Sequence, residues 1–175
     1  MKRRLILAST GAVLLAGCGF QLRQAPDFVF DSLVLNAPES SPLAAELRRS
    51  LAANGKVQVL SALPVAAPAA SAPVAARTGQ VVFDLLQEQR EKVVVGLNAS
   101  GQVREFQLRL RIRFRLRTAG GRELIPETEL LQQRDISFNE AAVLAKEAEE
   151  SLLYRDMQAD LVQQLMRRLA ALRTL

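Results

Sequence analysis

The sequence predicts an α+β domain, a two-layer sandwich in which two helices pack on one face of a four-stranded, mostly antiparallel sheet with an N-terminal strand–helix unit. Three observations lead to this prediction. From Phe106 to Leu116 every even-numbered residue is apolar and every odd-numbered one is polar or charged, which is the two-residue period of a half-buried strand. Segments 42–54 and 140–172 have the apolar spacing of helices. Short alternating segments before and between them complete the sheet.

The N-terminal part of the domain is predicted to be a strand–helix–strand unit. Residues Ser32–Asn36 form a first short strand, and the alternating residues 57–59 lie in a second. The helix between them begins at Ser41-Pro42, because serine is a favoured N-cap and proline is favoured at the first helical position. It ends at Asn54-Gly55, where glycine allows a left-handed cap. Such a unit favours a right-handed crossover between two parallel strands.

Three longer strands are expected to follow as an antiparallel meander. The first covers 81–95, and Gln87–Lys92, which is polar on both faces, indicates either a bulge or a strand that projects beyond its cover. Asn98–Gly101 turns the chain into the strand at 105–117. Ala119–Gly121 forms the next turn, as a three-residue loop with glycine in the left-handed conformation.

The alternation of apolar residues sets a register for each hairpin. For the first hairpin we expect the pairs Val93–Phe106, Phe83–Leu116, Leu85–Phe114, Asp84–Arg115 and Glu88–Arg111. For the second we expect Arg117–Glu123, Arg113–Glu127, Arg111–Glu129, Leu116–Leu124, Leu110–Leu130 and Ile112–Thr128.

The last element is predicted to be a helix from Glu140 to Leu172. Its N-cap is either Ser137, in a capping box with Glu140, or the competing residue Asn139. Its apolar stripe favours packing on the sheet over a coiled coil, and consists of Leu144, Ala148, Tyr154, Met157, Leu161, Leu165, Leu169 and Leu172.

The N-terminus has the features of a bacterial lipoprotein signal peptide. Basic residues at 2–4 precede the short apolar segment Leu5–Ala16, which is too short for a comfortable membrane span. The segment Leu15-Ala16-Gly17-Cys18 resembles a lipobox, and Cys18 is the only cysteine of the chain. The alternative is an ordinary signal peptide with an unrelated cysteine. We therefore expect residues 1–17 to be removed, Cys18 to carry acyl chains, and residues 18–175 to form one domain.

Composition excludes several classes of function. The chain has 175 residues and no histidine, which excludes histidine-based catalysis and the commonest transition-metal ligand. Three of its five net positive charges lie in the predicted signal peptide, so the net charge is a weak argument for nucleic acid. The Ala- and Pro-rich stretch at 61–78 is expected to be a flexible loop within the domain. No G-x-S-x-G motif supports a hydrolase.

Five arginines lie on the polar face of the strand at 105–117, namely Arg109, Arg111, Arg113, Arg115 and Arg117. If both registers hold, acidic residues of the two neighbouring strands flank at least four of them. The first interpretation is a solvated face of weak, exposed ion pairs. The second is a surface that grips phosphates of an anionic lipid or a nucleic acid. The first is favoured, since no aromatic residue is interleaved with these arginines to stack on bases.

Three segments resemble the LptE family of lipopolysaccharide-assembly lipoproteins. They are the lipobox followed by Cys18-Gly19-Phe20-Gln21-Leu22-Arg23, the segment 101–108 with Arg104-Glu105-Phe106-Gln107, and the segment 135–146 followed by Leu153-Tyr154-Arg155-Asp156-Met157. The resemblance covers the chain after residue 17 except the Ala/Pro loop. It implies two helices on a four-stranded sheet, in agreement with the element order above.

The resemblance also implies a function. Members of the family are lipid-anchored to the outer membrane, sit inside the lumen of the β-barrel LptD, help it to assemble, and assist delivery of lipopolysaccharide to the cell surface. They bind lipopolysaccharide through basic residues near one end of the sheet. The corresponding loop here, 96–102, has no Lys or Arg, and Lys92 and Arg104 flank it. These two are the candidate lipopolysaccharide contacts, and the five arginines are candidates for facing the barrel.

The resemblance implies no cofactor, no metal, no nucleic acid and no catalysis. The alternative function is a free-standing periplasmic lipid-binding or chaperone lipoprotein that needs no barrel.

Overall fold

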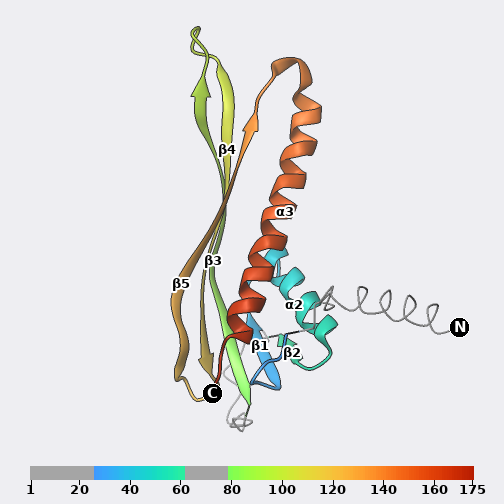
Figure 1. The fold of residues 1–175 in the computed structure, drawn as a ribbon, viewed down its shortest axis with the longest axis vertical. Coiled ribbons are helices and arrows are strands. Elements are labelled where there is room, and N and C mark those ends of the chain that lie inside the picture. Colours follow the sequence, from blue (N-terminus) through green and yellow to red (C-terminus); the bar gives the residue numbers. More distant parts are fainter. Residues whose placement is uncertain (1–25, 62–78) are drawn as a thin grey trace, which may run out of the picture.

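The computed structural model describes residues 26–61 and 79–175. Figure 1 shows a long, twisted sheet with helices along one side. In chain order the elements are β1 (Ser32–Asn36), α2 (Pro42–Asn54), β2 (Gln58–Ser61), β3 (Gln80–Leu97), β4 (Val103–Thr118), β5 (Glu123–Ser137), the 3₁₀ helix η1 (Glu140–Ala142) and α3 (Val143–Ala170). The fold is the predicted α+β sandwich of two helices on one sheet.

The sheet has five strands, in the order β2-β1-β3-β4-β5. β1 pairs in parallel with both β2 and β3, and the three long strands pair antiparallel. The strand–helix–strand prediction is therefore confirmed. The predicted count of four strands is one too few, because β2 pairs with β1 and so joins the same sheet instead of remaining part of a separate unit.

Helix α2 begins and ends as the sequence predicts. The Oγ of Ser41 accepts a hydrogen bond from the N–H of Ala44 at 3.0 Å, and Pro42 occupies the first helical position, where its missing N–H costs nothing. At the other end Gly55 has a φ of 72°, and its N–H bonds to the carbonyl of Ala52. This left-handed backbone is the reason why glycine stops the helix there.

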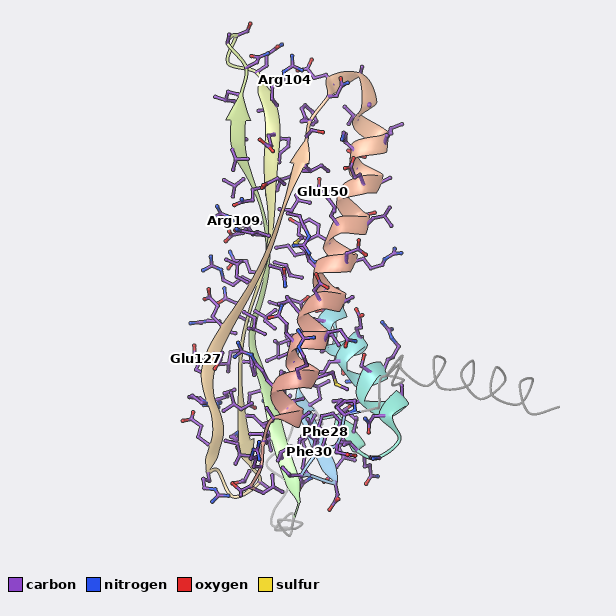
Figure 2. The ribbon with its side chains drawn as sticks, in the orientation of Figure 1. Phe28, Phe30, Arg104, Arg109, Glu127 and Glu150 are labelled. Carbon is purple, nitrogen blue, oxygen red and sulfur yellow. The ribbon has the colours of Figure 1, made fainter. Side chains whose placement is uncertain are left out.

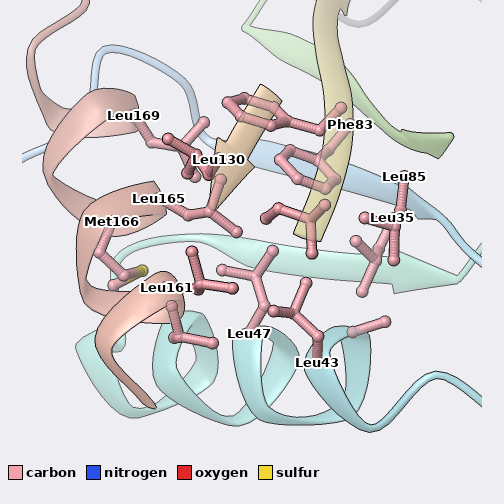
Figure 3. Packing of buried hydrophobic residues seen from close by; sticks show 14 of the residues in the cluster. Leu35, Leu43, Leu47, Phe83, Leu85, Leu130, Leu161, Leu165, Met166 and Leu169 are labelled. Carbon is pink, nitrogen blue, oxygen red and sulfur yellow. The ribbon is translucent and has the colours of Figure 1, made fainter. Parts of the chain in front are cut away.

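The core lies between the helices and the even-numbered residues of β4. Leu108, Leu110, Ile112, Phe114 and Leu116 are all fully buried, as the two-residue period predicts. Leucines of α2 and α3 pack against the sheet from one side, as Figure 3 shows. The core also includes Phe30, which precedes β1. Phe30 stands outside any periodic element, so no pattern marks it as buried.

The first hairpin follows the predicted register only as far as Leu85. Leu85 pairs with Phe114, but Gln87 pairs with Arg113, so Leu86 is an extra residue on β3. A bulge thus falls at Leu86, just before Gln87–Lys92, and every pair from Gln87 to Val94 moves by one. Glu88 pairs with Ile112 instead of Arg111, and Phe106 with Val94 instead of Val93. A shift of one residue reverses the two faces, so Glu88, Arg90 and Lys92 turn toward the helices.

The second hairpin departs from its predicted register near Phe114. Arg117 pairs with Glu123 as expected, but register shifts on both sides of Leu116 move every pair beyond them by two residues. On β4 apolar and polar residues alternate without interruption and so give no sign of these shifts, whereas on β5 the alternation is broken at Leu124-Ile125 and at Leu130-Leu131. Cα partners replace the predicted ones as follows: Arg113 with Glu129, Arg111 with Leu131, Leu116 with Ile125, Leu110 with Gln132 and Ile112 with Leu130. A shift of two residues keeps each side chain on its predicted face.

Helix α3 starts later than predicted. β5 continues to Ser137, so this residue belongs to a strand and does not cap a helix. The competing candidate Asn139 is the cap, and its side chain accepts from the N–H of Ala141 at the start of η1. Leu144 is 82% exposed and Ala148 is also exposed. The predicted stripe is therefore buried only from Tyr154 onward, where the helix reaches the core.

The molecule has two unlike halves. The lower half of Figure 1 holds β1, α2 and β2 beside the long strands, and both helices cover it. The upper half consists of β3 after Leu86, β4 before Ile112, β5 after Leu130 and the start of α3. Because α2 and β1 lie below it, α3 is the one described element that covers the upper half, which has a smaller apolar interior.

Three sequence predictions fall largely on residues outside the described ranges. These are the signal peptide at 1–17, the lipid anchor at Cys18 and, apart from Ser61, the loop at 61–78. Within residues 26–61 and 79–175, no helix is both long and apolar enough to cross a membrane.

Candidate functional site

Five of the six arginines of β4 form one row on the sheet face away from the helices, which we call the arginine row: Arg109, Arg111, Arg113, Arg115 and Arg117. Figure 2 shows Arg109 and Glu127 directed away from α3. Arg111 lies 3.6 Å from Glu129 and Arg113 lies 3.0 Å from Glu127. These are the predicted acid partners. In the shifted register each lies two residues along β5 from the position directly opposite its arginine. Arg109 donates from Nε to the Oε1 of Gln107 at 2.8 Å and has no acid partner among the ion pairs of the described residues.

Asp84 anchors the lower end of the arginine row. It accepts from the Nε of Arg115 and from the Nε of Arg117, each at 2.9 Å, and from the Nδ2 of Asn36 at 2.8 Å. The pair with Arg115 is as predicted, whereas Arg117 bonds to Asp84 in preference to Glu123. The Asp84 side chain is only 3% exposed. A buried carboxylate needs this many partners, because an unpaired charge in the interior is costly.

The surroundings of Asp84 set its pKa. Burial by itself raises the pKa, but the hydrogen bonds from Arg117, Asn36 and Arg115 and the charge of Arg117 lower it more strongly. The result is a pKa of about 2, below the ordinary value of 3.8. Asp84 is therefore ionised throughout the neutral range, and its single charge pairs with two guanidinium groups.

The upper half carries a second group of side chains, on the face toward α3. The Nζ of Lys92 lies 2.6 Å from Glu150 on α3 and 4.4 Å from the ring centroid of Phe106. Phe106 in turn meets Phe138 edge to face, with ring centroids 5.4 Å apart. Lys146 of α3 lines the same small cavity of about 60 Å³.

Arg104 lies beside this group, near the upper end of β4 in Figure 2. Its carbonyl accepts from the N–H of Phe138 at 2.7 Å, and it lines a hollow of about 200 Å³ that Phe138 separates from Lys92. We define the tip cluster as Lys92, Arg104, Phe106, Phe138 and Lys146. It brings cations and two aromatic rings to one end of the sheet. The two predicted candidates, Lys92 and Arg104, line two separate hollows that share Phe138.

Lys146 and Phe138 are the members of the tip cluster that sequence reasoning missed as site residues. Lys146 donates to the Oγ of Ser137 at 3.0 Å and pairs with Glu149 at 2.8 Å. Phe138 lies in the connection from β5 to α3, and Lys146 lies in the first turn of α3. Because β5 extends to Ser137, Phe138 and Lys146 lie at the end of the sheet. The sequence pattern predicts a helix start at 137–140 and so does not predict this position.

Comparison with known proteins places this fold among small bacterial lipoproteins. An uncharacterized lipoprotein B from Nitrosomonas europaea superposes with a TM-score of 0.67 and 32% identity, covering 87% of this chain and 91% of that one. The rare lipoprotein B from Shewanella oneidensis gives 0.62 and 20% identity over 80% and 94% of the two chains. A minor lipoprotein from Acinetobacter baumannii gives 0.58 and 23% identity over 83% and 94%. At these lower identities the last two establish the fold alone.

The family follows from the sequence itself. Residues 30–169 match the family described as "LptE: Lipopolysaccharide-assembly". The chain therefore belongs to the LptE family of lipopolysaccharide-assembly lipoproteins. A comparison with curated proteins gave no match.

The arrangement around Asp84 predicts a specific loss of stability in acid. Because the folded pKa of about 2 lies below the unfolded value, the contribution of Asp84 is complete above about pH 4 and is lost as the pH falls through 2. Between pH 5 and pH 2, the wild-type free energy of unfolding should fall by about 2 kcal/mol more than that of Asp84→Asn. Urea unfolding at several pH values measures this difference.

Asp156→Asn, which alters an exposed carboxylate of α3, is the matched control and should follow the wild-type profile. An Asp84→Asn protein with the same pH dependence as the wild type would show that Asp84 is not held as an anion by its arginines.

Proposed function

We propose that this protein is an outer-membrane lipoprotein that is anchored through acyl chains on Cys18 and plugs the lumen of an LptD-type β-barrel. In this role it helps the barrel to assemble and assists delivery of lipopolysaccharide to the outer leaflet, and it catalyses no reaction. The match to the LptE family over residues 30–169 is the observation that carries the proposal.

The two-sided sheet supports the role of a plug. One face is buried under the helices, and the other presents the arginine row with its acid partners, whose side chains are between a third and a half exposed. The interior of a transmembrane barrel is polar. A face of partly exposed ion pairs can exchange its hydration for polar groups of such a wall, whereas an apolar face could not. We assign the arginine row to contact with the barrel.

The tip cluster supports contact with lipopolysaccharide. Lipopolysaccharide carries phosphate groups beside acyl chains, so a site for it needs cations and apolar surface together. Lys92, Arg104 and Lys146 supply the cations, and Phe106 and Phe138 supply the apolar surface between them. Lys92 is held by Glu150 in the free protein, so a phosphate would compete with this carboxylate for the ammonium group.

Charge reversal in the arginine row tests the plug. The double substitution Arg111→Glu and Arg113→Glu should greatly reduce the amount of barrel that co-purifies in mild detergent. The new glutamates would repel Glu127 and Glu129 and any barrel groups that are complementary to the arginines. Size-exclusion chromatography followed by mass identification of the partner measures the complex. The intact mass of the same wild-type sample should show residues 1–17 removed and Cys18 acylated.

Arg48→Glu with Arg49→Glu is the matched control, since it changes the charge equally on exposed positions of α2. Circular dichroism verifies that each variant is folded. Unchanged co-purification of the Arg111/Arg113 variant would exclude this face. A wild-type protein that never associates with a barrel would support the free-standing lipid-binding or chaperone function instead.

Removal of cations from the tip cluster tests lipopolysaccharide contact. The double variant Lys92→Ala and Arg104→Ala should bind purified lipopolysaccharide at least about tenfold more weakly, since each charge-assisted contact to phosphate is worth more than 1 kcal/mol. Lys56→Ala, which alters an exposed lysine near the end of α2, serves as control. If the double variant and the control bind equally, the tip cluster is not the contact site.

A further inference from the structure

The upper part of β3 has a free edge. β1 pairs with β3 only as far as Asn36 opposite Asp84, yet β3 continues to Leu97, well past the end of β1 in Figure 1. On its other side β3 stays paired with β4 along this whole stretch. Alternate N–H and C=O groups of β3 therefore point to a side on which, within the described part of the chain, no strand lies.

The side chains that could guard this edge are held against their own molecule. Native proteins protect free edges with charged side chains, prolines and bulges, because an unpaired edge is a template for another strand. Here the side chains of 87–92 are engaged in the following contacts: Glu88 with Ser41 at 2.5 Å, Arg90 with Gln158 at 3.2 Å, Lys92 with Glu150 at 2.6 Å, Gln87 with Gln89 at 2.7 Å and Gln89 with Glu91 at 2.9 Å.

Apolar residues continue the edge above these contacts. Val93, Val94 and Val95 are between 37% and 47% exposed, and branched side chains of this kind favour strand pairing. The opposite edge of the sheet, β5, differs. It carries Pro126 and an almost continuous series of polar and charged residues from Glu127 to Asp135. The two edges thus share polar side chains, but β5 also carries Pro126, which has no N–H to donate, whereas β3 carries three consecutive exposed valines near its end.

A groove lies at the lower end of the free edge. It has a volume of about 590 Å³ and is formed where the loop from β1 to α2 approaches β3. Its lining includes Pro38, Pro42 and Leu86, the last of which is 41% exposed. The groove is therefore partly apolar and opens beside the point where β1 leaves the sheet.

Glu88 gives the groove a chemical preference. Its Oε2 accepts from Ser41, but its Oε1 is buried and has no hydrogen-bond partner among the described residues. A buried carboxylate oxygen without a donor costs free energy that a ligand with an N–H group would recover. A lysine or arginine side chain supplies both the donor and the opposite charge.

We propose that the edge of β3 from Leu86 to Val94 binds an extended segment of the barrel partner, which adds a strand beside β3 where β1 would otherwise continue. The added strand gains its affinity from main-chain hydrogen bonds, and apolar side chains of the segment pack beside Val93 and Val94. One lysine or arginine of the segment enters the groove and donates to the Oε1 of Glu88. The identity of the partner rests on the proposed function; the edge and the groove are new.

Charge favours this occupant over a second copy of the chain. The cations that β3 itself offers near this edge are Arg90 and Lys92. Both are bonded to residues of α3, so two β3 edges would meet without a free donor for Glu88.

Hydrogen exchange of the lipidated full-length protein, alone and in complex with the barrel, tests the inference. The amides of 86–94 that point away from β4 should exchange rapidly in the free protein and slow at least about tenfold in the complex, while β5 amides at 126–135 keep their rates. A stable complex in which 86–94 exchange as in the free protein would overturn this inference and leave the plug intact. Failure to form a complex would overturn both. Protection of 86–94 in the free protein that grows with its concentration would assign the edge to a second copy.

A substitution on the edge gives a second readout. Val94→Lys should weaken the complex about tenfold, because a lysine on an edge strand opposes strand addition. Val29→Lys is the matched control, since Val29 is 39% exposed and lies outside the strands. Equal effects of the two substitutions, or no effect of Val94→Lys, would overturn the proposed binding edge.

Discussion

Burial of one face of β4 is the interaction on which the remaining structure depends. Each fully buried leucine, isoleucine or phenylalanine of this face contributes about 2 kcal/mol. An exposed ion pair on the opposite face contributes well under 1 kcal/mol. The apolar residues therefore decide which way the sheet faces, and the arginines occupy the other side whatever their own contribution. Most of these arginines contribute little to stability and are therefore available for binding. The exceptions are Arg115 and Arg117, because they pair with the buried carboxylate of Asp84.

The bulge at Leu86 divides the molecule into a lower part with a dense apolar core and an upper part in which β3 meets the helices through polar contacts. Below it, the odd-numbered residues of β3 face the helices and join an apolar core under two helices. Above it, the faces of β3 are exchanged, so that Glu88, Arg90 and Lys92 meet α2 and α3 through polar contacts. A single inserted residue thus ends the dense core and creates the polar half. That half holds the tip cluster and the free edge of β3.

The bounds of α2 and the buried face of β4 could be predicted from local sequence patterns. The strand registers could not, because they depend on pairing between distant segments. The bounds of α2 follow from Ser41, Pro42 and Gly55 alone, and the buried face of β4 follows from its period. The positions of the bulges depend on how two strands twist against each other, which neither strand encodes by itself. For this reason Glu88 was expected on the arginine face. Lys92 and Arg104 were expected near one end of the sheet, where they line neighbouring hollows. Lys146 lies beside Lys92 because β5 runs on to Ser137, which the sequence pattern did not predict.

The central claim is that one face of β4 is buried and the other is exposed to solvent. Thiol labelling tests this claim most directly. Lipidated protein in detergent would carry either Ile112→Cys, on the buried face, or Arg113→Cys, on the arginine row. Cys18, the only native cysteine, would be blocked by its acyl chains. A water-soluble maleimide should label Arg113→Cys at the rate of a free thiol and Ile112→Cys at least about a hundredfold more slowly, because the buried thiol reacts only after local unfolding. Equal labelling rates would contradict the account.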